Sequence, residues 1–186
     1  MENNFDANFF KKRVHLIWRA APITNMIMSY FKPKTMIDLG CSIGEFIREF
    51  ECNGVESCGV ELSQEVTPFL LCPKSSIFFK DLTKPLKIND SFDIALCFMV
   101  VGRLPESKWG AVAKNIKKLS KTAVTVVENE QRWAYEMWKQ GFTLDAWTTS
   151  AMKKDLAHLK DKTAVRSFYN HIQVFFRTWN GLDEVR

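Results

Sequence analysis

The sequence lacks the long apolar runs, paired cysteine motifs and low-complexity tracts that mark several classes of protein. No apolar run approaches the ~20 residues that a membrane-spanning helix needs. The chain begins MENNFDANFFKKRV, without the apolar stretch and cleavage site of a secretory signal. None of the five cysteines forms a C-x-x-C pair. We therefore expect a cytoplasmic protein without a disulfide framework or metal site, whose cysteines act as small core residues.

Histidine is also scarce, and the charges nearly balance. The 26 Lys and Arg residues exceed the 21 Asp and Glu residues by five, a surplus that permits a polyanionic partner without requiring one. Hydrophobic residues make up 46% of the chain and charged residues 25%, as in globular proteins. A chain of 186 residues fits one domain better than two. We expect a single domain over residues 1–186, with an N-terminal helical cap at 1–33 and a core at 35–180.

Strand-like and helix-like segments alternate along the chain, which is typical of βαβ architecture. Helical periodicity covers residues 7–31, and Pro33 ends it. Further helices are expected around Phe46 to Phe50 and at 65–71, 106–119, 131–140 and 151–159. The expected strands are 35–39, 57–62, 76–80, 92–99, 122–127, 142–147 and 164–179. The long final segment favours an antiparallel partner. The prediction is a doubly wound α/β fold with a mostly parallel seven-stranded sheet, its last strand antiparallel, and helices on both faces.

Small residues dominate the turn that follows the first expected strand, Asp38-Leu39-Gly40-Cys41-Ser42-Ile43-Gly44. Gly40 permits a sharp exit from the strand, while Ser42 and Gly44 allow the backbone to approach a ligand closely. A dinucleotide fingerprint would need G-x-G-x-x-G. Ser42 and Glu45 occupy its second and third glycine positions, and Glu45 would set a negative charge where a pyrophosphate sits. We therefore expect that NAD does not bind.

Acidic residues follow the next two expected strands. Glu61 ends the second strand, 23 residues after Asp38, and a carboxylate there can accept hydrogen bonds from both hydroxyls of a ribose. Asp81 comes just after the third strand, and Phe98 lies at the exit of the apolar fourth strand. Because the carboxyl ends of parallel strands share one edge of the sheet, these residues are expected to meet in one crevice.

The order and spacing of these features resemble the class I S-adenosylmethionine-dependent methyltransferases over about residues 35–180. The resemblance implies that S-adenosylmethionine is the cofactor. It places Asp38 at the methionine ammonium, the glycine turn beneath the methionine, Glu61 at the ribose, Asp81 near adenine and Phe98 toward the transferable methyl. The complete set of cofactor-binding residues that it implies is Asp38, Gly40, Cys41, Ser42, Gly44, Glu61, Leu62, Asp81, Leu82 and Phe98.

The substrate side of the expected site is less specific. The [DNS]-P-P-[YF] motif of nucleic-acid amino-methyltransferases is absent from residues 97–105. This loop is similar to that of small-molecule methyltransferases, which often read E-H-L-P, with Gly102 and Arg103 in place of the Glu-His pair. Arg103 is a candidate contact for an acidic substrate, or else a solvated arginine. His15 is a candidate base, or else a surface residue. No catalytic residue is assigned.

The expected function is a metal-independent S-adenosylmethionine-dependent methyltransferase that acts on a small-molecule or nucleotide-type acceptor, with no membrane partner. Two alternatives remain open. A nucleic-acid (RNA or tRNA) methyltransferase is favoured by the basic N-terminal helix and by the lysines Lys114, Lys117, Lys118 and Lys121. A non-catalytic S-adenosylmethionine-binding interaction domain is compatible with the weak catalytic signature. Glu128 and Glu130, after the fifth strand, are candidate substrate contacts.

Overall fold

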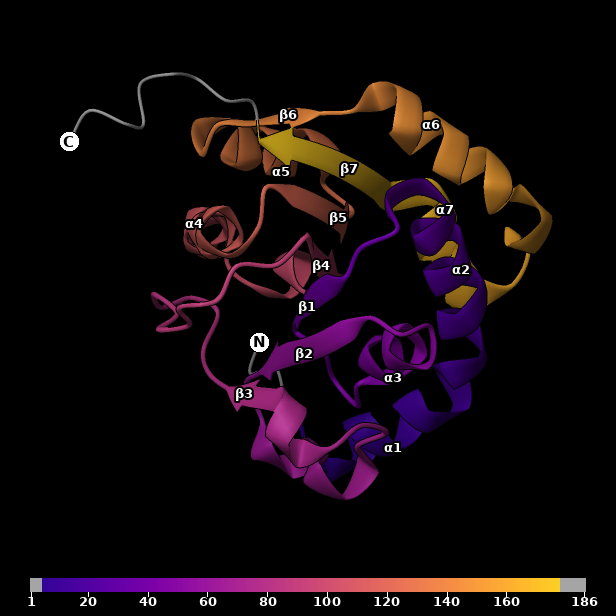
Figure 1. The fold of residues 1–186 in the computed structure, drawn as a ribbon, viewed down its shortest axis with the longest axis vertical. Helices are drawn as coiled ribbons and strands as arrows, with labels where there is room; N and C mark the ends of the chain where they lie inside the picture. The colour runs from indigo at the N-terminus through magenta and orange to yellow at the C-terminus, as the bar shows by residue number, and fades with distance from the viewer. Residues whose placement is uncertain (1–4, 178–186) are drawn as a thin grey trace.

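A computed structural model describes residues 5–177 and shows a central sheet wrapped by helices (Figure 1). The strands are β1 (Thr35–Leu39), β2 (Glu56–Glu61), β3 (Ile77–Phe79), β4 (Ile94–Phe98), β5 (Thr122–Val126), β6 (Phe142–Leu144) and β7 (Ile172–Arg177). The helices are α1 (Ala7–Arg13), α2 (Ala20–Phe31), α3 (Glu45–Cys52), α4 (Trp109–Leu119), α5 (Glu130–Lys139), α6 (Ala146–Asp155) and α7 (Thr163–His171). A 3₁₀ segment, Val14–Arg19, joins α1 to α2.

The sheet has the order β3-β2-β1-β4-β5-β7-β6. Pairing is parallel from β3 through β5. β7 is antiparallel to both β5 and β6. The predicted fold class is confirmed, including the reversed final strand. The two outer strands, β3 and β6, are only three residues long.

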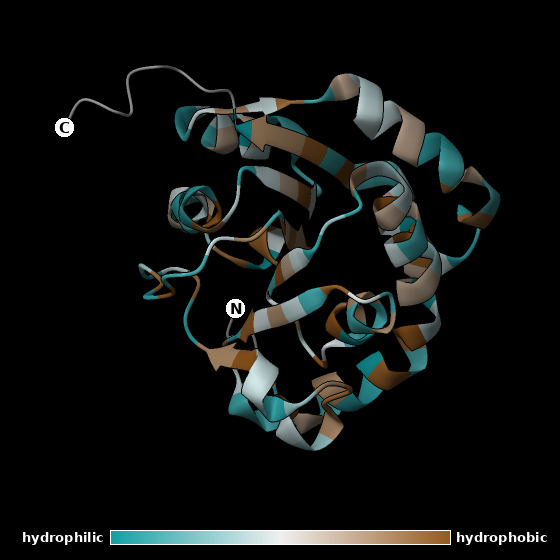
Figure 2. Ribbon diagram, viewed as in Figure 1, coloured by the Kyte–Doolittle hydropathy of each residue, from teal (hydrophilic) through white to brown (hydrophobic). Residues whose placement is uncertain are grey.

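Alternate residues along each inner strand pack against helices on opposite faces of the sheet. Met36 and Leu96 face a core that includes α2, α3, α6 and α7. Their neighbours in sequence, Ile37 and Ala95, face a second core that includes α4 and α5. Figure 1 shows α4 on one side of the strands and α2 and α7 on the other. All five residues of β4 are buried, as expected for a central strand covered on both faces. Figure 2 shows apolar colour along β3 and β7, with mixed bands on the surrounding helices.

The prediction of a strand over 164–179 is wrong in its first half. Residues 163–171 form α7, and only Ile172–Arg177 form a strand. Val165 and Phe168 are buried at the i, i+3 spacing of a helix, a pattern that the β-branched and aromatic composition of the segment obscures. Residues 178–179 of the predicted strand lie outside the described residues.

Other element boundaries also differ from the prediction. The helix predicted at 151–159 is α6, which begins at Ala146 and ends at Asp155. Two further differences have clear local reasons. The strand predicted at 142–147 ends at Leu144 because Asp145 starts α6, its carboxylate accepting a hydrogen bond of 3.0 Å from the Thr148 amide. The helix predicted at 65–71 is a 3₁₀ turn, Gln64–Phe69, that contains Pro68. Proline removes a backbone donor and disfavours a longer α-helix.

Candidate cofactor site

A cavity lies at the carboxyl ends of β1, β2 and β4, and the N-terminal segment closes it. Its volume is about 90 Å³. Seven of the ten predicted cofactor residues line it, namely Gly40, Ser42, Glu61, Leu62, Asp81, Leu82 and Phe98. The other lining residues are Phe5, Phe9, Arg13, Thr83, Met99, Val100, Arg103 and Leu104. The structure therefore brings together strand ends that are up to 60 residues apart in sequence.

Glu61 joins the ends of β1 and β2 through its carboxylate. Its Oε2 accepts a hydrogen bond of 3.0 Å from the Ser42 amide, and its Oε1 accepts bonds from the amides of Leu62 (2.8 Å) and Ser63 (3.0 Å). The side chain is 8% exposed. A carboxylate offers about four acceptor sites, so three backbone donors leave one acceptor site, on Oε2. The sequence predicted a ribose-binding carboxylate here but gave no sign that the backbone already holds it.

The turn after β1 has unusual backbone geometry at two of its small residues. Gly40 has a φ of +85°, and a Cβ there would overlap the side chain of Val100. Ser42 also has a positive φ, +52°, which non-glycine residues rarely adopt. The Oγ of Ser42 is buried and has no hydrogen-bond partner in residues 5–177. A small residue is thus required at position 40, and the hydroxyl at position 42 is available to a ligand.

Three of the predicted cofactor residues do not line the cavity. Cys41 packs closely against Gly59 of β2: a Cβ added to this glycine would lie only 2.6 Å from the Cys41 Sγ. Gly44 allows close packing against Cys72, whose Sγ is 2.5 Å from a Cβ built on the glycine. Asp38 is 3% exposed in β1. Burial, with added repulsion from Glu45 and Glu61, raises the pKa of the Asp38 carboxyl well above its usual range.

Asp81 lies at the far side of the cavity, after β3. Its carboxylate accepts a hydrogen bond of 2.8 Å from the Thr83 amide, which fixes the turn into the following loop. Leu82, beside it, is 8% exposed. The expected adenine-flanking pair therefore forms one wall of the cavity, opposite the turn at Gly40 and Ser42.

Glu45 does not present its charge to the cavity, contrary to the expectation from the sequence. Its Oε1 lies 2.7 Å from Arg19 Nη2 and 3.5 Å from Arg13 Nη2. Glu45 and Arg19 are both 2% exposed, so the pair anchors the N-terminal segment to the start of α3. The electrostatic part of the argument against NAD therefore fails, while the part based on glycine spacing stands.

Arg13 is a lining residue that the sequence did not single out. It sits in the last turn of α1, and its side chain is 17% exposed. Burial, with repulsion from Arg19 as the next cause, lowers its pKa to about 10, so it stays charged at neutral pH. A basic residue on an amphipathic N-terminal helix gives no sequence signal of this role, because only tertiary packing brings it to the carboxyl edge of the sheet.

Aromatic rings and a second arginine also border the cavity. Phe98 packs against Phe46 and Phe168, each with ring centroids 5.0 Å away. Arg103, in the loop after β4, has its guanidinium 5.4 Å from the centre of the Phe9 ring. Its Nε donates a hydrogen bond of 3.2 Å to the carbonyl of Met99. The loop after β4 and helix α1 thus meet through this arginine.

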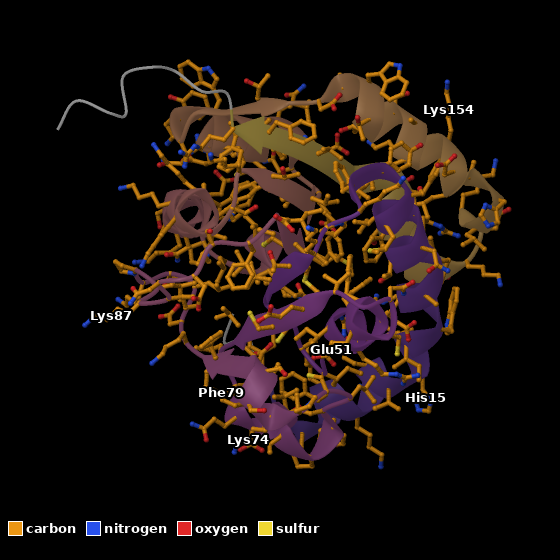
Figure 3. The ribbon with its side chains drawn as sticks, in the orientation of Figure 1. His15, Glu51, Lys74, Phe79, Lys87 and Lys154 are labelled. Carbon is orange, nitrogen blue, oxygen red and sulfur yellow. The ribbon has the colours of Figure 1, made fainter. Side chains whose placement is uncertain are left out.

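The remaining sequence candidates lie outside the cavity. His15 is exposed at the periphery of the molecule (Figure 3). Glu130 accepts contacts from His171 Nδ1 at 3.3 Å and from Lys153 Nζ at 3.4 Å, in an open depression that also includes Glu128. Three aromatic residues of α5 also lie outside the cavity: Trp133 is fully buried, whereas Tyr135 and Trp138 stack on the surface with ring centroids 5.9 Å apart.

Two structural features are absent from residues 5–177. No group of three or more His, Cys, Asp or Glu side chains is arranged to hold a metal ion in this part of the chain. None of its helices has the length and apolar character needed to span a membrane.

Comparison with known proteins identifies the family. A family model described as a methyltransferase domain matches residues 12–177. A TehB-like S-adenosylmethionine-dependent methyltransferase from Corynebacterium glutamicum superposes with a TM-score of 0.67 and 16% identity, over 92% of this chain and 98% of that chain. No curated protein sequence gives a significant match.

Two further structures show the same fold. The magnesium protoporphyrin IX methyltransferase of Synechocystis, with bound S-adenosylmethionine, has a TM-score of 0.55 and 15% identity over 77% of this chain and 76% of that chain. The glycopeptide N-methyltransferase MtfA, with S-adenosylhomocysteine, has a TM-score of 0.50 and 12% identity over 56% of this chain and 51% of that chain. The chain matches only about half of the length of Streptomyces venezuelae DesVI (50%) and of the S-adenosylhomocysteine-bound MtfA chain (51%).

The family match extends over most of the described chain, and the strand order with its reversed β7 agrees with it. The chain therefore belongs to the class I S-adenosylmethionine-dependent methyltransferases.

Proposed function

We propose that this enzyme methylates a small-molecule acceptor and binds its cofactor in the cavity at the carboxyl edge of the sheet. The observation that carries the proposal is that Glu61, hydrogen-bonded to the Ser42 amide, lines the same cavity as the Gly40–Ser42 turn and Asp81. When bound, S-adenosylmethionine supplies an electrophilic methyl group on a sulfonium. The enzyme's own contribution is to hold the reacting groups in line and to exclude water.

Glu61 is proposed to bind the ribose. The acceptor site that remains on its Oε2 suits one ribose hydroxyl, and a second hydroxyl can bind if the Ser42 amide releases this oxygen. The buried, unpaired Oγ of Ser42 offers a further polar contact at the same place. Asp81 and Leu82 are proposed to flank adenine, and Phe98 to line the end where the methyl group lies.

Asp38 and Arg13 are proposed to hold the methionine end, which carries an ammonium and a carboxylate. Burial, followed by repulsion from Glu45 and Glu61, raises the pKa of the Asp38 carboxyl, and a cationic ammonium beside it would favour its ionised form. Arg13 remains charged and borders the cavity. An arginine is well suited to a carboxylate because its planar fork makes two parallel hydrogen bonds.

The cavity must widen to admit the cofactor. Its volume of about 90 Å³ is below the ~300–1,000 Å³ typical of ligand pockets. The wall formed by Phe5 and Phe9 belongs to the N-terminal segment rather than to the sheet. We propose that this segment moves outward when the cofactor binds and then closes over it.

Three of the four lysines named for a nucleic-acid acceptor lie away from the cofactor cavity. Lys117, Lys118, Lys121 and Arg177 line a depression beside Asp93 and Ser120, at the amino ends of β4 and β5. The cofactor cavity lies at the opposite edge of the sheet. A polyanion bound to these lysines would be on the far side from the transferable methyl.

The proposed reaction needs no metal, and the proposed location is the cytoplasm. All five cysteines are free thiols, as is usual in a reducing compartment. The absence of a metal-binding cluster among the described residues is compatible with methyl transfer that depends only on positioning.

Isothermal titration calorimetry with S-adenosylhomocysteine tests the proposed cofactor site. Glu61→Gln should weaken binding at least ~10-fold, because it replaces a charge-assisted hydrogen bond and sets an amide donor against backbone donors. Glu65→Gln, an exposed change four residues away, is the matched control and should bind as the wild type does. Circular dichroism checks that both variants fold. Equal affinity of a folded Glu61→Gln protein and the wild type would refute the assignment.

A further inference from the structure

A basic surface follows α4 and is separate from the cofactor cavity. It consists of two depressions, one of about 910 Å³ between α4 and α5 and one of about 310 Å³ at the end of α4. Lys118 lines both depressions, so they adjoin, and no residue of either lines the cofactor cavity. We call the combined surface the α4 groove. The cationic residues that line it are Lys114, Lys117, Lys118, Lys121, Lys139 and Arg177.

Cations outnumber acids in the α4 groove. Against its six cations the lining contains two acids, Asp93 and Glu136. Asp93 accepts hydrogen bonds from two backbone amides, at 2.7 and 3.1 Å, and Glu136 is buried against Arg132 and Lys139. The charged residues that adjoin the lining in sequence or by an ion pair also have a cationic majority, namely Lys84, Lys87, Lys108 and Arg132 against Asp90 and Glu106. The charge of the groove therefore favours a partner with several negative charges.

The lysines of α4 present their charges together. Lys117 and Lys118 come three and four residues after Lys114, so the three side chains are neighbours on the helix surface. Lys121 follows the helix and lines the same depression as Lys117 and Lys118. Lys114, Lys118 and Lys121 are exposed, and none of them makes an ion pair with another of residues 5–177. Such a row suits a chain of successive phosphates better than a single anion.

An exposed aromatic pair borders the groove on its α5 side. Tyr135 and Trp138 are 49% and 66% exposed, and their rings stack with centroids 5.9 Å apart. Lys139 connects the pair to the groove, because it lines the groove and its Nζ lies 5.0 Å from the centre of the Tyr135 ring. Proteins hold single-stranded nucleic acid with this combination, in which cations contact the phosphates and aromatic rings stack on the bases.

The shape of the groove distinguishes a nucleic-acid strand from other polyanions. A flat array of anionic lipid headgroups does not reach cations that line a depression between two helices. An acidic peptide matches the lysines, but a nucleic-acid strand supplies a planar base with every negative charge. The groove offers binding partners for both groups, in its lysines and in Tyr135 and Trp138.

We propose that the α4 groove binds single-stranded nucleic acid, with its phosphates on the lysines and its bases stacked on Tyr135 and Trp138. The strand is a docking partner rather than the methyl acceptor, since the groove and the cofactor cavity share no lining residue. This inference is independent of the proposed small-molecule reaction.

Fluorescence anisotropy with labelled oligothymidylate and oligouridylate of ~12 nucleotides tests the proposal. The wild type should bind at least one of them. Between ~50 and ~200 mM salt, the logarithm of the association constant should fall with a slope of about −3 to −4, as expected for about four to six phosphate contacts. Lys114→Gln/Lys121→Gln should weaken binding at least ~10-fold and make the slope shallower by ~1.4. Trp138→Ala should weaken binding at least ~5-fold without changing the slope, because the ring carries no charge.

Two matched controls lie on α6 and just after it. Lys154→Gln/Lys160→Gln removes the same charge from exposed positions, and Lys154 projects on the other side of the molecule from α4 (Figure 3). Trp147→Ala removes a ring that is 77% exposed. Both controls should bind the oligonucleotides as the wild type does, and circular dichroism checks that every variant folds.

The outcomes separate this inference from its alternatives. It is overturned if neither oligonucleotide binds, or if the control variants lose as much affinity as the groove variants. Binding to phosphatidylserine vesicles without binding to either oligonucleotide would assign the surface to a membrane instead. Transfer of a labelled methyl group from S-adenosylmethionine to the oligonucleotide would make the strand an acceptor and overturn its role as a docking partner. If S-adenosylhomocysteine fails to bind while the oligonucleotide binds as described, the proposed function fails and this inference stands.

Discussion

Replacing Glu45 by alanine should destabilise the protein severely, because it leaves a buried charge without its partner. Glu45 and Arg19 are each 2% exposed and lie 2.7 Å apart. The hydrogen bond to Glu45 comes from Arg19 Nη2, and the buried Nε of Arg19 has no hydrogen-bond partner within residues 5–177. Removal of one member of such a pair costs ~3–5 kcal/mol. For a protein of this size each kcal/mol lowers Tm by ~2–4 °C, so the expected loss is ~6–20 °C.

Urea denaturation followed by circular dichroism measures this change. Glu49→Ala is the control, since Glu49 pairs with the exposed Arg48 at 3.8 Å, and such surface pairs contribute ~0–1 kcal/mol. The double variant Arg19→Met/Glu45→Leu should cost less than Glu45→Ala alone, because it buries apolar atoms in place of an unpaired charge. A loss below ~1 kcal/mol in Glu45→Ala, no larger than in the control, would contradict the reasoning.

Three further substitutions test the site. Ser42→Gly should stabilise the protein by ~1 kcal/mol in urea denaturation, because it relieves the positive φ of +52° at this residue. That φ costs ~1–2 kcal/mol in a non-glycine residue, which is more than the entropy that glycine adds to the unfolded chain. Destabilisation would contradict this. The raised pKa of Asp38 means that the folded protein holds the carboxyl proton more tightly than the unfolded chain does. The free energy of unfolding should therefore fall as the pH rises from ~4. Asp38→Asn should flatten the profile of Tm against pH, and an unaltered slope would refute the assignment. Phe9→Ala should speed S-adenosylhomocysteine association in stopped-flow measurements because it opens the cavity wall, whereas Phe69→Ala, which changes the same apolar cluster away from the cavity lining, should not.

The sequence allowed prediction of those parts of the fold that depend on local pattern. The strands β1, β2, β4 and β5 were located to within about two residues. In β4, burial on both faces gives an uninterrupted apolar signal. The helix at 163–171 was missed because its β-branched and aromatic residues fit either period. Strand ends were predictable as site residues because topology brings them to one edge.

Contacts that depend on tertiary packing could not be predicted. Arg13 and Phe9 reach the cavity only because α1 docks across the sheet edge, and nothing in the spacing of that helix indicates it. Likewise, Glu45 looked like a charge aimed at a ligand, but its partner Arg19 lies 26 residues earlier. Long-range ion pairs leave no periodic signal in a single sequence.

The brevity of the two outer strands has a consequence for association with other molecules. A long, flat outer strand exposes unpaired backbone groups that can recruit another chain by strand addition. β3 and β6 expose only three residues each, and Lys80 follows β3 directly. Any lasting complex formed by this protein should therefore join through side chains on its helices, and its sheet should not extend into a neighbouring subunit.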